Sequence, residues 1–393
     1  MINKKLVYYL LFALGLFFLS VTLTYGVIRL VNKNPSGIIS PEGKKITNIP
    51  VEKSTKAKKP KFDPSVSLTA NCPLNGQMYP STYEDIWKTR RPLAVMIENH
   101  LDSRPLSGLS YADVIYEAVA EGGITRQMGL FLCDIAGQNI TLAPVRSARI
   151  YYTKIVTEYD ALYNHVGGAG NCDDPTVDER AKALCFIKRN KIKDLDQFGL
   201  DFKACHRLTN RLDREIAYEH TMACFTEELY KVAAKRDWQN EGEWDKLFIP
   251  WKFKDPAADT GLVSDISFDF WKSKSDYSVA WKYDKSNNSY SRTNAGIPVV
   301  DLNTDDLIAA KNVVIQFVRE TGPLDEHLHM DYQVIGTGKS IVFQDGKAIL
   351  GTWSRATLAA RTKFMAEGKE IAFNKGQIWI ELVPDGNVVE YNK

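Results

Sequence analysis

The chain has 393 residues, of which 44% are hydrophobic and 25% are charged, a composition typical of a globular protein with room for two domains. Its formal net charge is only +2, and it contains no motif for binding RNA or DNA. A polyanionic partner for the chain as a whole is therefore excluded, and we expect no nucleic-acid ligand.

Residues 1–33 predict an N-terminal membrane anchor. Residues 6–28 carry no charge over 23 positions, which is long enough for a helix to cross a bilayer. A cleaved secretory signal would have a shorter apolar core and a cleavage site of small residues, which this segment lacks. It also contains no cysteine that could carry a lipid. We therefore expect an uncleaved signal anchor in the cell membrane, with a single-pass helix and the main body extracytoplasmic.

Residues 34–83 predict a linker. Between Glu42 and Lys61 there are seven lysines against two glutamates, and four prolines lie between Pro35 and Pro60. Such a segment cannot bury a core and should stay extended. It is either a solvated tether or a stretch that lies along an anionic membrane surface.

Residues 84–240 predict an α/β domain with a mixed sheet, because short apolar segments typical of strands alternate with helical segments. The expected strands are Leu93–Glu98, Asp113–Val119, Gln127–Cys133, Ile140–Val145 and Leu162–Val166. The expected helices are Ser147–Tyr159, Thr176–Arg189 and Thr226–Lys235, the first with Ser147 as its N-cap.

Residues 241–393 predict a mostly β domain. The expected strands are Ser278–Tyr283, Val313–Val318, Tyr332–Ile335, Ser340–Phe343, Lys347–Trp353 and Ile378–Val383. The pairs Asp345-Gly346 and Asp385-Gly386 follow such segments and predict hairpin turns. The expected fold class is therefore α/β, followed by a β-rich domain.

The spacing of cysteines and histidines predicts disulfides and no thiolate metal site. Six cysteines permit three disulfides in an exported protein, with fifteen connectivities that the sequence leaves open. None lies in a CxxC motif or a cysteine–histidine cluster with zinc spacing. Cys133 is either a disulfide partner or a buried small apolar side chain. His327 and His329 would share one face of a strand, but no third ligand accompanies them.

The segment Pro144-Val-Arg-Ser-Ala-Arg149 predicts a site for an anion. Main-chain amides in the first turn of the expected helix lack intrahelical partners, and Arg146 and Arg149 flank this turn. Together these groups suit a phosphate or a carboxylate. The alternative is that both arginines form ordinary ion pairs with nearby carboxylates.

Six further candidate residues lie at strand ends or turns of the expected α/β sheet, where sites of such sheets occur. We expect Arg126, His165 and His220 to bind a ligand together with Arg149. The candidates for catalysis, beside Arg146, are Glu98, Asp113 and Asp160. Arginines with several carboxylates suit a phosphate bridged by a divalent cation, and paired carboxylates suit acid–base chemistry. Each carboxylate taken alone is better explained as a solvated loop charge, because Asp and Glu are mostly exposed in proteins.

Nine segments of the chain resemble the YerB-type family of bacterial extracytoplasmic proteins. They are Arg91-Pro-Leu-Ala-Val-Met-Ile-Glu-Asn99, Arg104-Pro-Leu-Ser-Gly-Leu109, Ala112-Asp-Val-Ile-Tyr-Glu117, Glu121-Gly-Gly-Ile-Thr-Arg126, Pro144-Val-Arg-Ser-Ala-Arg149, Asn312-Val-Val-Ile-Gln316, Gly336-Thr-Gly-Lys339, Gly351-Thr-Trp353 and Gly376-Gln-Ile-Trp-Ile-Glu381. The resemblance spans about residues 84–390 and implies an N-terminal α/β part, a C-terminal β part and no established function. The chain departs from that family in having a membrane helix instead of a lipid-modified cysteine. It also has Glu219-His220-Thr221 where the family tends to have Pro-His-Asn.

A second resemblance is to the extracytoplasmic LytR–CpsA–Psr phosphotransferases, which move glycopolymers from a polyprenyl pyrophosphate carrier onto the cell wall. It rests on the order and spacing of Ala112-Asp113-Val114, Pro144-Val145-Arg146 and Tyr163-Asn164-His165-Val166-Gly167-Gly168. It implies that Asp113 binds magnesium and that Arg146 and Arg149 bind the pyrophosphate. Ser147 stands where those enzymes have an aspartate, and they have no counterpart of the β part. Magnesium is expected only on this interpretation; otherwise no cofactor is assigned.

Two functions are therefore compared. The first is a non-catalytic envelope protein that binds a glycan, a peptide or a partner protein, with its arginines in an internal ion-pair network. The alternative is an envelope phosphotransferase or hydrolase that acts on a phosphorylated lipid or glycan. Unpaired arginines in a pocket would favour the enzyme, because such groups are costly to keep without a ligand.

Overall fold

The computed structural model describes residues 65–257 and 260–392. The expected membrane helix, residues 6–28, and the expected linker up to residue 64 lie outside the described residues. Within the described ranges, no helix combines the length and the apolar character needed to cross a membrane.

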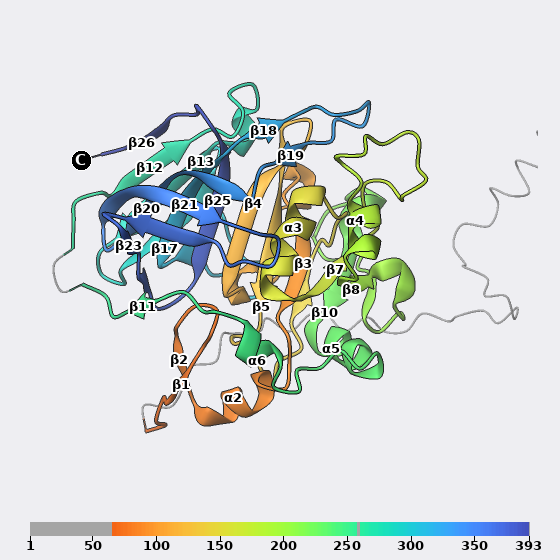
Figure 1. The fold of residues 1–393 in the computed structure, drawn as a ribbon, viewed down its shortest axis with the longest axis horizontal. Coiled ribbons are helices and arrows are strands. Elements are labelled where there is room, and N and C mark those ends of the chain that lie inside the picture. The colour runs from red at the N-terminus through yellow and green to blue at the C-terminus, as the bar shows by residue number, and fades with distance from the viewer. Residues whose placement is uncertain (1–64, 258–259, 393) are drawn as a thin grey trace, which may run out of the picture. The chain divides into compact units, whose positions relative to one another are not determined.

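An eleven-stranded mixed sheet forms the centre of the described chain (Figure 1). In spatial order its strands are β23 (Lys369–Glu370), β22 (Lys363–Ala366), β21 (Lys347–Arg355), β20 (Gly336–Gln344), β17 (Asn312–Val318), β25 (Ile378–Pro384), β4 (Val114–Glu121), β5 (Ile124–Phe131), β3 (Leu93–Glu98), β7 (Leu162–His165) and β8 (Lys193–Asp196). Strands from both expected domains meet in it, because β25 pairs in parallel with β4. The central strands are continuous apolar segments, as expected where both faces of a sheet are covered.

The parallel strands of this sheet end at a common edge. β3, β7 and β8 run parallel, as do β17, β25 and β4. Between the two groups, β5 is antiparallel to both β3 and β4, so that β3 and β4 point the same way. We call the edge where β3, β4, β7 and β8 end the carboxyl edge; in α/β sheets this is where ligands usually bind.

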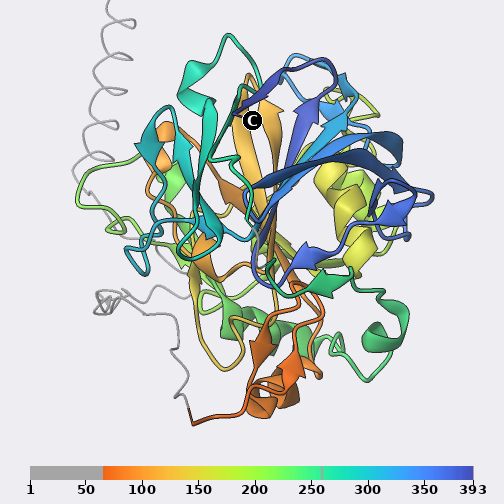
Figure 2. The same ribbon diagram turned by 90° about the vertical axis from the view of Figure 1, so that its left-hand side faces the viewer.

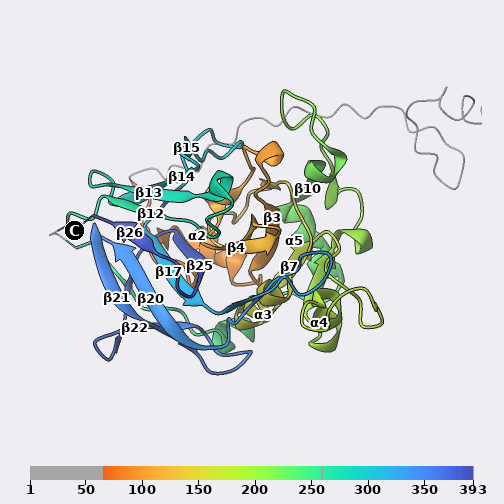
Figure 3. The same cartoon turned by 90° about the horizontal axis from the view of Figure 1, so that it is seen from above.

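The two faces of the central strands are covered differently (Figures 2 and 3). On one face, helix α3 (Ile150–Tyr159) packs on β4, and the hydroxyls of Tyr116 and Tyr159 lie 2.7 Å apart. On the other, Glu117, the next residue of β4, contacts Arg292 of a second, six-stranded sheet. That sheet contains β15 (Ile297–Pro298), β14 (Ser289–Asn294), β13 (Val279–Asp284), β12 (Asp265–Phe268) and β26 (Val389–Tyr391), with β16 (Ala309–Ala310) paired to β14.

Smaller elements surround these layers. A three-stranded sheet joins β6 (Thr141–Leu142), β10 (Met222–Phe225) and β9 (Cys205–Arg207). Three two-stranded sheets pair β1 (Ala70–Asn71) with β2 (Met78–Tyr79), β11 (Phe253–Lys254) with β24 (Phe373–Asn374), and β18 (Glu320–Thr321) with β19 (Asp331–Tyr332). The other α-helices are α2 (Ser81–Trp87), α4 (Ala183–Arg189), α5 (Thr226–Lys235) and α6 (Trp244–Leu247). The 3-10 turns are η1 (Leu101–Ser103), η2 (Leu109–Tyr111), η3 (Gln197–Gly199), η4 (Tyr218–Thr221) and η5 (Ser275–Tyr277).

The expected fold class, an α/β part followed by a mostly β part, is confirmed. The expected strand Leu93–Glu98 and helix Thr226–Lys235 have the bounds of β3 and α5. The hairpin at Asp345-Gly346 is also confirmed, because Gln344 pairs with Lys347. The hairpin expected at Asp385-Gly386 is wrong: β26 leaves the central sheet and pairs with β12.

Two helix starts were placed too early. The expected N-cap Ser147 is wrong, because α3 begins at Ile150 with the extended residue Arg149 before it. The amides of Arg146 and Ala148 instead donate to carbonyls of Met96 and Gly167, which holds this segment straight against the sheet. The helix expected from Thr176 begins only at Ala183. In the first case, hydrogen bonds to the sheet edge replace those of a first helical turn.

All six cysteines form disulfides. The pairs are Cys72–Cys133, Cys172–Cys185 and Cys205–Cys224. Of the two roles open for Cys133, the structure shows the disulfide.

Replacing both Cys205 and Cys224 by serine should lower the free energy of unfolding by about 3 kcal/mol, because the bridge closes a loop across a sequence separation of 19. Denaturation in guanidinium, with and without a reductant, measures this loss. An unchanged midpoint in the variant would contradict the prediction and would show that this bridge does not constrain the unfolded chain.

Candidate functional site

The carboxyl edge collects six of the eight predicted site residues. They are Glu98, Arg126, Arg146, Arg149, His165 and His220. Strand register explains why Asp113 and Asp160 are not among them. Val114 and Ala94 both pair with Leu130, which places Asp113 at the start of β3 and β4. Asp160 precedes β7, whose Leu162 pairs with Leu93 at that same opposite end.

Glu98 is the centre of a group that we call the Glu98 cluster: Glu98, His100, Asp102, Arg146 and His220. The buried Glu98 carboxylate lies 2.8 Å from Nδ1 of His220 and 3.0 Å from Nε of Arg146. The main chain fixes this arrangement, because the Glu98 amide donates to the carbonyl of Pro144 at 2.9 Å. One carboxylate at the end of β3 therefore orients a histidine and an arginine from two distant parts of the chain.

Arg146 is partly open to solvent. Its Nη1 donates to the carbonyl of Glu219 at 3.0 Å, and 25% of its side chain is exposed. Within residues 65–257 and 260–392, no group accepts a hydrogen bond from its Nη2. Arg146 therefore keeps one donor available for a ligand.

Arg126 and Arg149 are, in contrast, paired internally by Glu121. Nη2 of Arg126 and Nη2 of Arg149 each lie 2.7 Å from a different oxygen of this carboxylate. Burial alone would raise the pKa of Glu121, but the charges of the two arginines lower it to about 2. Nη1 of Arg126 donates to the carbonyl of Ser147, and Nη1 of Arg149 donates to that of Ala148. The ion pairs that were the alternative for Arg146 and Arg149 are present, to Glu98 and to Glu121 respectively, and Arg126 shares the carboxylate of Glu121.

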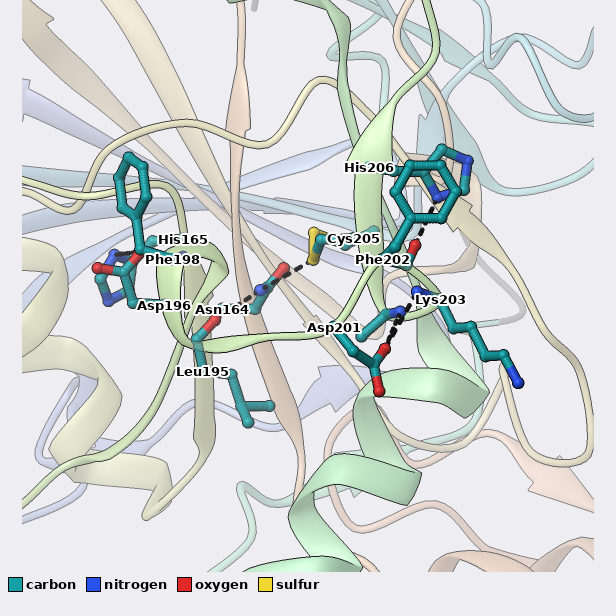
Figure 4. The surroundings of a disulfide bond; sticks show 12 residues. Asn164, His165, Leu195, Asp196, Phe198, Asp201, Phe202, Lys203, Cys205 and His206 are labelled. Carbon is teal, nitrogen blue, oxygen red and sulfur yellow. Dashed lines mark hydrogen bonds and ion pairs between the residues drawn. A yellow bond between two sulfur atoms is a disulfide. The ribbon is translucent and has the colours of Figure 1, made fainter. Parts of the chain in front are cut away.

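His165 lies at the end of β7 and is fully buried. Its Nε2 is 2.9 Å from Asp194, and its Nδ1 is 2.8 Å from the carbonyl of Gly167. Figure 4 shows the ring beside Asp196 and Phe198, on the other side of the drawn region from the stacked rings of Phe202 and His206. Both ring nitrogens are thus occupied within the protein. Ligand binding by His165 stays a prediction.

Asp113 and Asp160 have structural partners. Oδ1 of Asp113 accepts from Asn75 at 2.7 Å, and its Oδ2 accepts from the amides of Leu132 and Cys133. Asp160 pairs with Arg91 and Lys193. Because N–H donors contact both oxygens of Asp113, this carboxylate does not fit the role of a magnesium ligand. The structure does not bring it to Arg146 and Arg149, as the phosphotransferase resemblance implied.

Two members of the Glu98 cluster, His100 and Asp102, were missed in the sequence. The rings of His100 and His220 stack with centroids 4.7 Å apart and planes at 17°. Ligand atoms of His100, Asp102 and His220 all lie within 4.8 Å of one another. A signal was present, because His100 follows the expected site residue Glu98 by two positions at a strand end. Its partner could not be inferred, since His220 lies 120 positions further along the chain.

The turn that carries His100 and Asp102 is held by two arginines. Nη1 and Nη2 of Arg211 donate to the carbonyls of Pro105 and Ser103, both at 2.5 Å. Arg214 donates to the carbonyls of Asp102 and Arg104 at 2.8 and 3.1 Å. Burial lowers the pKa of Arg211 to about 10. Such contacts fix the backbone below the histidine and the aspartate before any ligand binds.

Comparison with known proteins shows which family the chain resembles. The family model described as "Protein of unknown function (DUF3048) N-terminal domain" matches residues 80–239, and the family model of the corresponding C-terminal domain matches residues 266–380. A protein of Bacillus subtilis (strain 168), "Putative lipoprotein YerB", is 28% identical over 306 residues, which is 77% of this chain and 84% of that protein. The crystal structure of the YerB protein from Bacillus subtilis is similar with a TM-score of 0.67 at 25% identity, over 82% of this chain and 100% of that one.

Proposed function

The chain belongs to the YerB-type family, and from this membership we propose that it is a membrane-anchored, extracytoplasmic binding protein of the bacterial envelope. The uncharged residues 6–28 support the anchor. The pairing of all six cysteines in disulfides supports the location, because disulfides persist outside the cytoplasm. The name of the Bacillus subtilis relative, "Putative lipoprotein YerB", agrees with an extracytoplasmic location at the membrane.

The ligand carries an anionic group that binds at the Glu98 cluster. The observation that carries this proposal is the free donor Nη2 of Arg146, the one predicted arginine whose side chain is partly exposed; its Nη1 donates to the carbonyl of Glu219, and its Nε lies in an ion pair with Glu98. A guanidinium fixed in this way is suited to a carboxylate or a phosphate. Both groups occur in envelope material, as wall-peptide carboxylates and as phosphates of lipid carriers.

Binding without turnover fits the arrangement better than phosphoryl transfer. The aspartate expected to bind magnesium is at the opposite end of the sheet and fully hydrogen-bonded. Among the described residues, no serine, threonine or cysteine hydrogen-bonds to His220, so the Glu98–His220 pair has no nucleophile to activate.

The full chain in detergent should be stabilised by its ligand, and Arg146→Ala should abolish this effect. A ligand at about a hundred times its dissociation constant adds roughly 2.7 kcal/mol to the free energy of unfolding, which is several degrees in Tm. The measurement compares a short polyprenyl phosphate with a wall peptide that carries only carboxylates. Whichever raises Tm identifies the source of the anion.

The control is Arg180→Ala, which removes an arginine that is 59% exposed and forms an ion pair with Asp178. This variant should keep the full Tm shift. An equal shift in the wild type and in Arg146→Ala would contradict the proposed site. Release of inorganic phosphate from the polyprenyl phosphate would contradict binding without turnover.

A further inference from the structure

We infer that the Glu98 cluster contains a binding site for a zinc ion, with His100, Asp102 and His220 as its protein ligands. Two imidazoles and one carboxylate form a ligand set that zinc accepts, and three protein ligands leave a fourth position open. Ligand atoms of these residues already lie within 4.8 Å of one another. Zinc–ligand bonds of about 2.0–2.2 Å require them to approach by roughly a further ångström.

The side chains that must move are the exposed ones. Asp102 is 65% exposed and can change rotamer freely, whereas His100 is 31% exposed and would give up its stacking on His220 and the hydrogen bond that its Nδ1 accepts from the amide of Asp102. The two rings stack with their planes nearly parallel, and a rotation of His100 would let both nitrogens face one ion. His220 is buried and is the fixed ligand of the three.

Glu98 prepares His220 for this role. It accepts from Nδ1 of His220 at 2.8 Å, which leaves the lone pair on Nε2. Metal-binding histidines in proteins usually donate their second ring N–H to such a carboxylate, which fixes the tautomer and raises the basicity of the ligand. No group among the described residues hydrogen-bonds to Nε2 of His220. This buried carboxylate–histidine pair is an observation independent of the ligand distances.

The charges around the site must also allow a cation to bind. The positive charge of Arg146 disfavours a zinc ion, but this guanidinium is already bound by Glu98 and by the carbonyl of Glu219. Arg211 and Arg214 direct donors to main-chain carbonyls of the turn. The carboxylate of Glu219 is on the favourable side, because it interacts with His100 and His220.

The test uses the full chain in detergent, freed of metal with a chelator and titrated with zinc and, for its visible spectrum, with cobalt(II). One ion should bind per chain, and His220→Asn and His100→Gln should each abolish the cobalt spectrum. Glu98→Gln should weaken zinc binding by about 10–100-fold, as is typical when an outer-shell partner is lost. Because His100 is partly exposed and His220 is buried, His100→Gln puts the fold at less risk than His220→Asn does.

The matched control is His327→Gln, because His327 and His329 are a second histidine pair, with ring centroids 5.6 Å apart. It should leave the stoichiometry and the affinity unchanged. Zinc binding that survives His100→Gln and His220→Asn, or that is lost in His327→Gln, would overturn the inference, as would no binding at all. The result is independent of the anionic ligand, since zinc is titrated without it.

Discussion

Replacing Arg292 by alanine should lower the free energy of unfolding by about 3–5 kcal/mol, because removal of one partner leaves buried charge uncompensated. Arg292 lies in β14 and has no exposed surface. Its Nη2 is 2.7 Å from Glu117 and its Nη1 is 2.5 Å from Glu381. This one guanidinium therefore joins the six-stranded sheet to two neighbouring strands of the central sheet.

Aromatic side chains enclose the same guanidinium. Its carbon lies 4.6 Å from the ring centre of Trp379 and 5.2 Å from that of Trp281. Stacking on these rings is lost in Arg292→Ala and adds to the effect. Denaturation followed by tryptophan fluorescence would measure the change in stability. A native spectrum that also shifts would indicate local rearrangement around Trp281 and Trp379.

A pair of control variants separates charge from packing. Arg180→Ala breaks an exposed ion pair and should cost at most about 1 kcal/mol. Combining Arg292→Met with Glu117→Gln and Glu381→Gln removes the buried charges of Arg292 and Glu117 and the ionisable group of Glu381 at similar volume, and should recover much of the loss. If the triple variant is less stable than Arg292→Ala, packing and not uncompensated charge explains the effect.

How much could be predicted from the sequence depended on the range of the interactions. β3 and α5 were predicted with their exact bounds, because a continuous apolar segment and a run opened by Thr226 and two glutamates are local signals. The start of α3 was not predicted correctly, because it is determined by hydrogen bonds from the amides of Arg146 and Ala148 to distant residues. The hairpin predicted at Asp385-Gly386 was wrong for the same reason, since β26 pairs with the distant strand β12.

The same difference between local and long-range signals applies to the candidate site. Glu98 and Arg146 were identified from their positions at a strand end and in a distinctive motif, and the structure brings them together. Asp113 was assigned to the same site because it also lies at a strand boundary. Residue periodicity does not reveal at which end of the parallel strands a boundary falls, and the register places Asp113 at the other end. The contact of His100 with His220 required knowledge of two turns that only the tertiary fold brings together.

The free energy of unfolding should fall as the pH rises from about 5 to 8, and Glu381→Gln should remove most of this dependence. Burial, strengthened by the charge of Glu117 and opposed by that of Arg292, raises the pKa of Glu381 from 4.5 to about 8. Between these two values the folded chain holds a proton that the unfolded chain has released. Its contribution to stability is therefore complete below pH 4.5 and is lost as the pH rises through 8.

The expected slope is about 1.4 kcal/mol for each pH unit within this window, or roughly 4 kcal/mol between pH 5 and 8. The measurement is urea denaturation of the wild type and of Glu381→Gln at several pH values in that range. Glutamine has the shape of the protonated acid, so its carbonyl can still accept from Arg292 and Trp281. The two proteins should be closest in stability at pH 5, and the variant should be clearly the more stable at pH 8.

Glu158 contributes to the pH dependence that remains in the variant. Burial also raises the pKa of this carboxyl, against the charge of Arg355 and hydrogen bonds from Thr362. A residual slope of the same sign in Glu381→Gln is therefore expected, and the difference between the two curves isolates Glu381. Parallel curves would mean that Glu381 is already ionised at pH 5. Arg292 would then be held between two full negative charges, and the single change Arg292→Ala should be still more destabilising than about 5 kcal/mol.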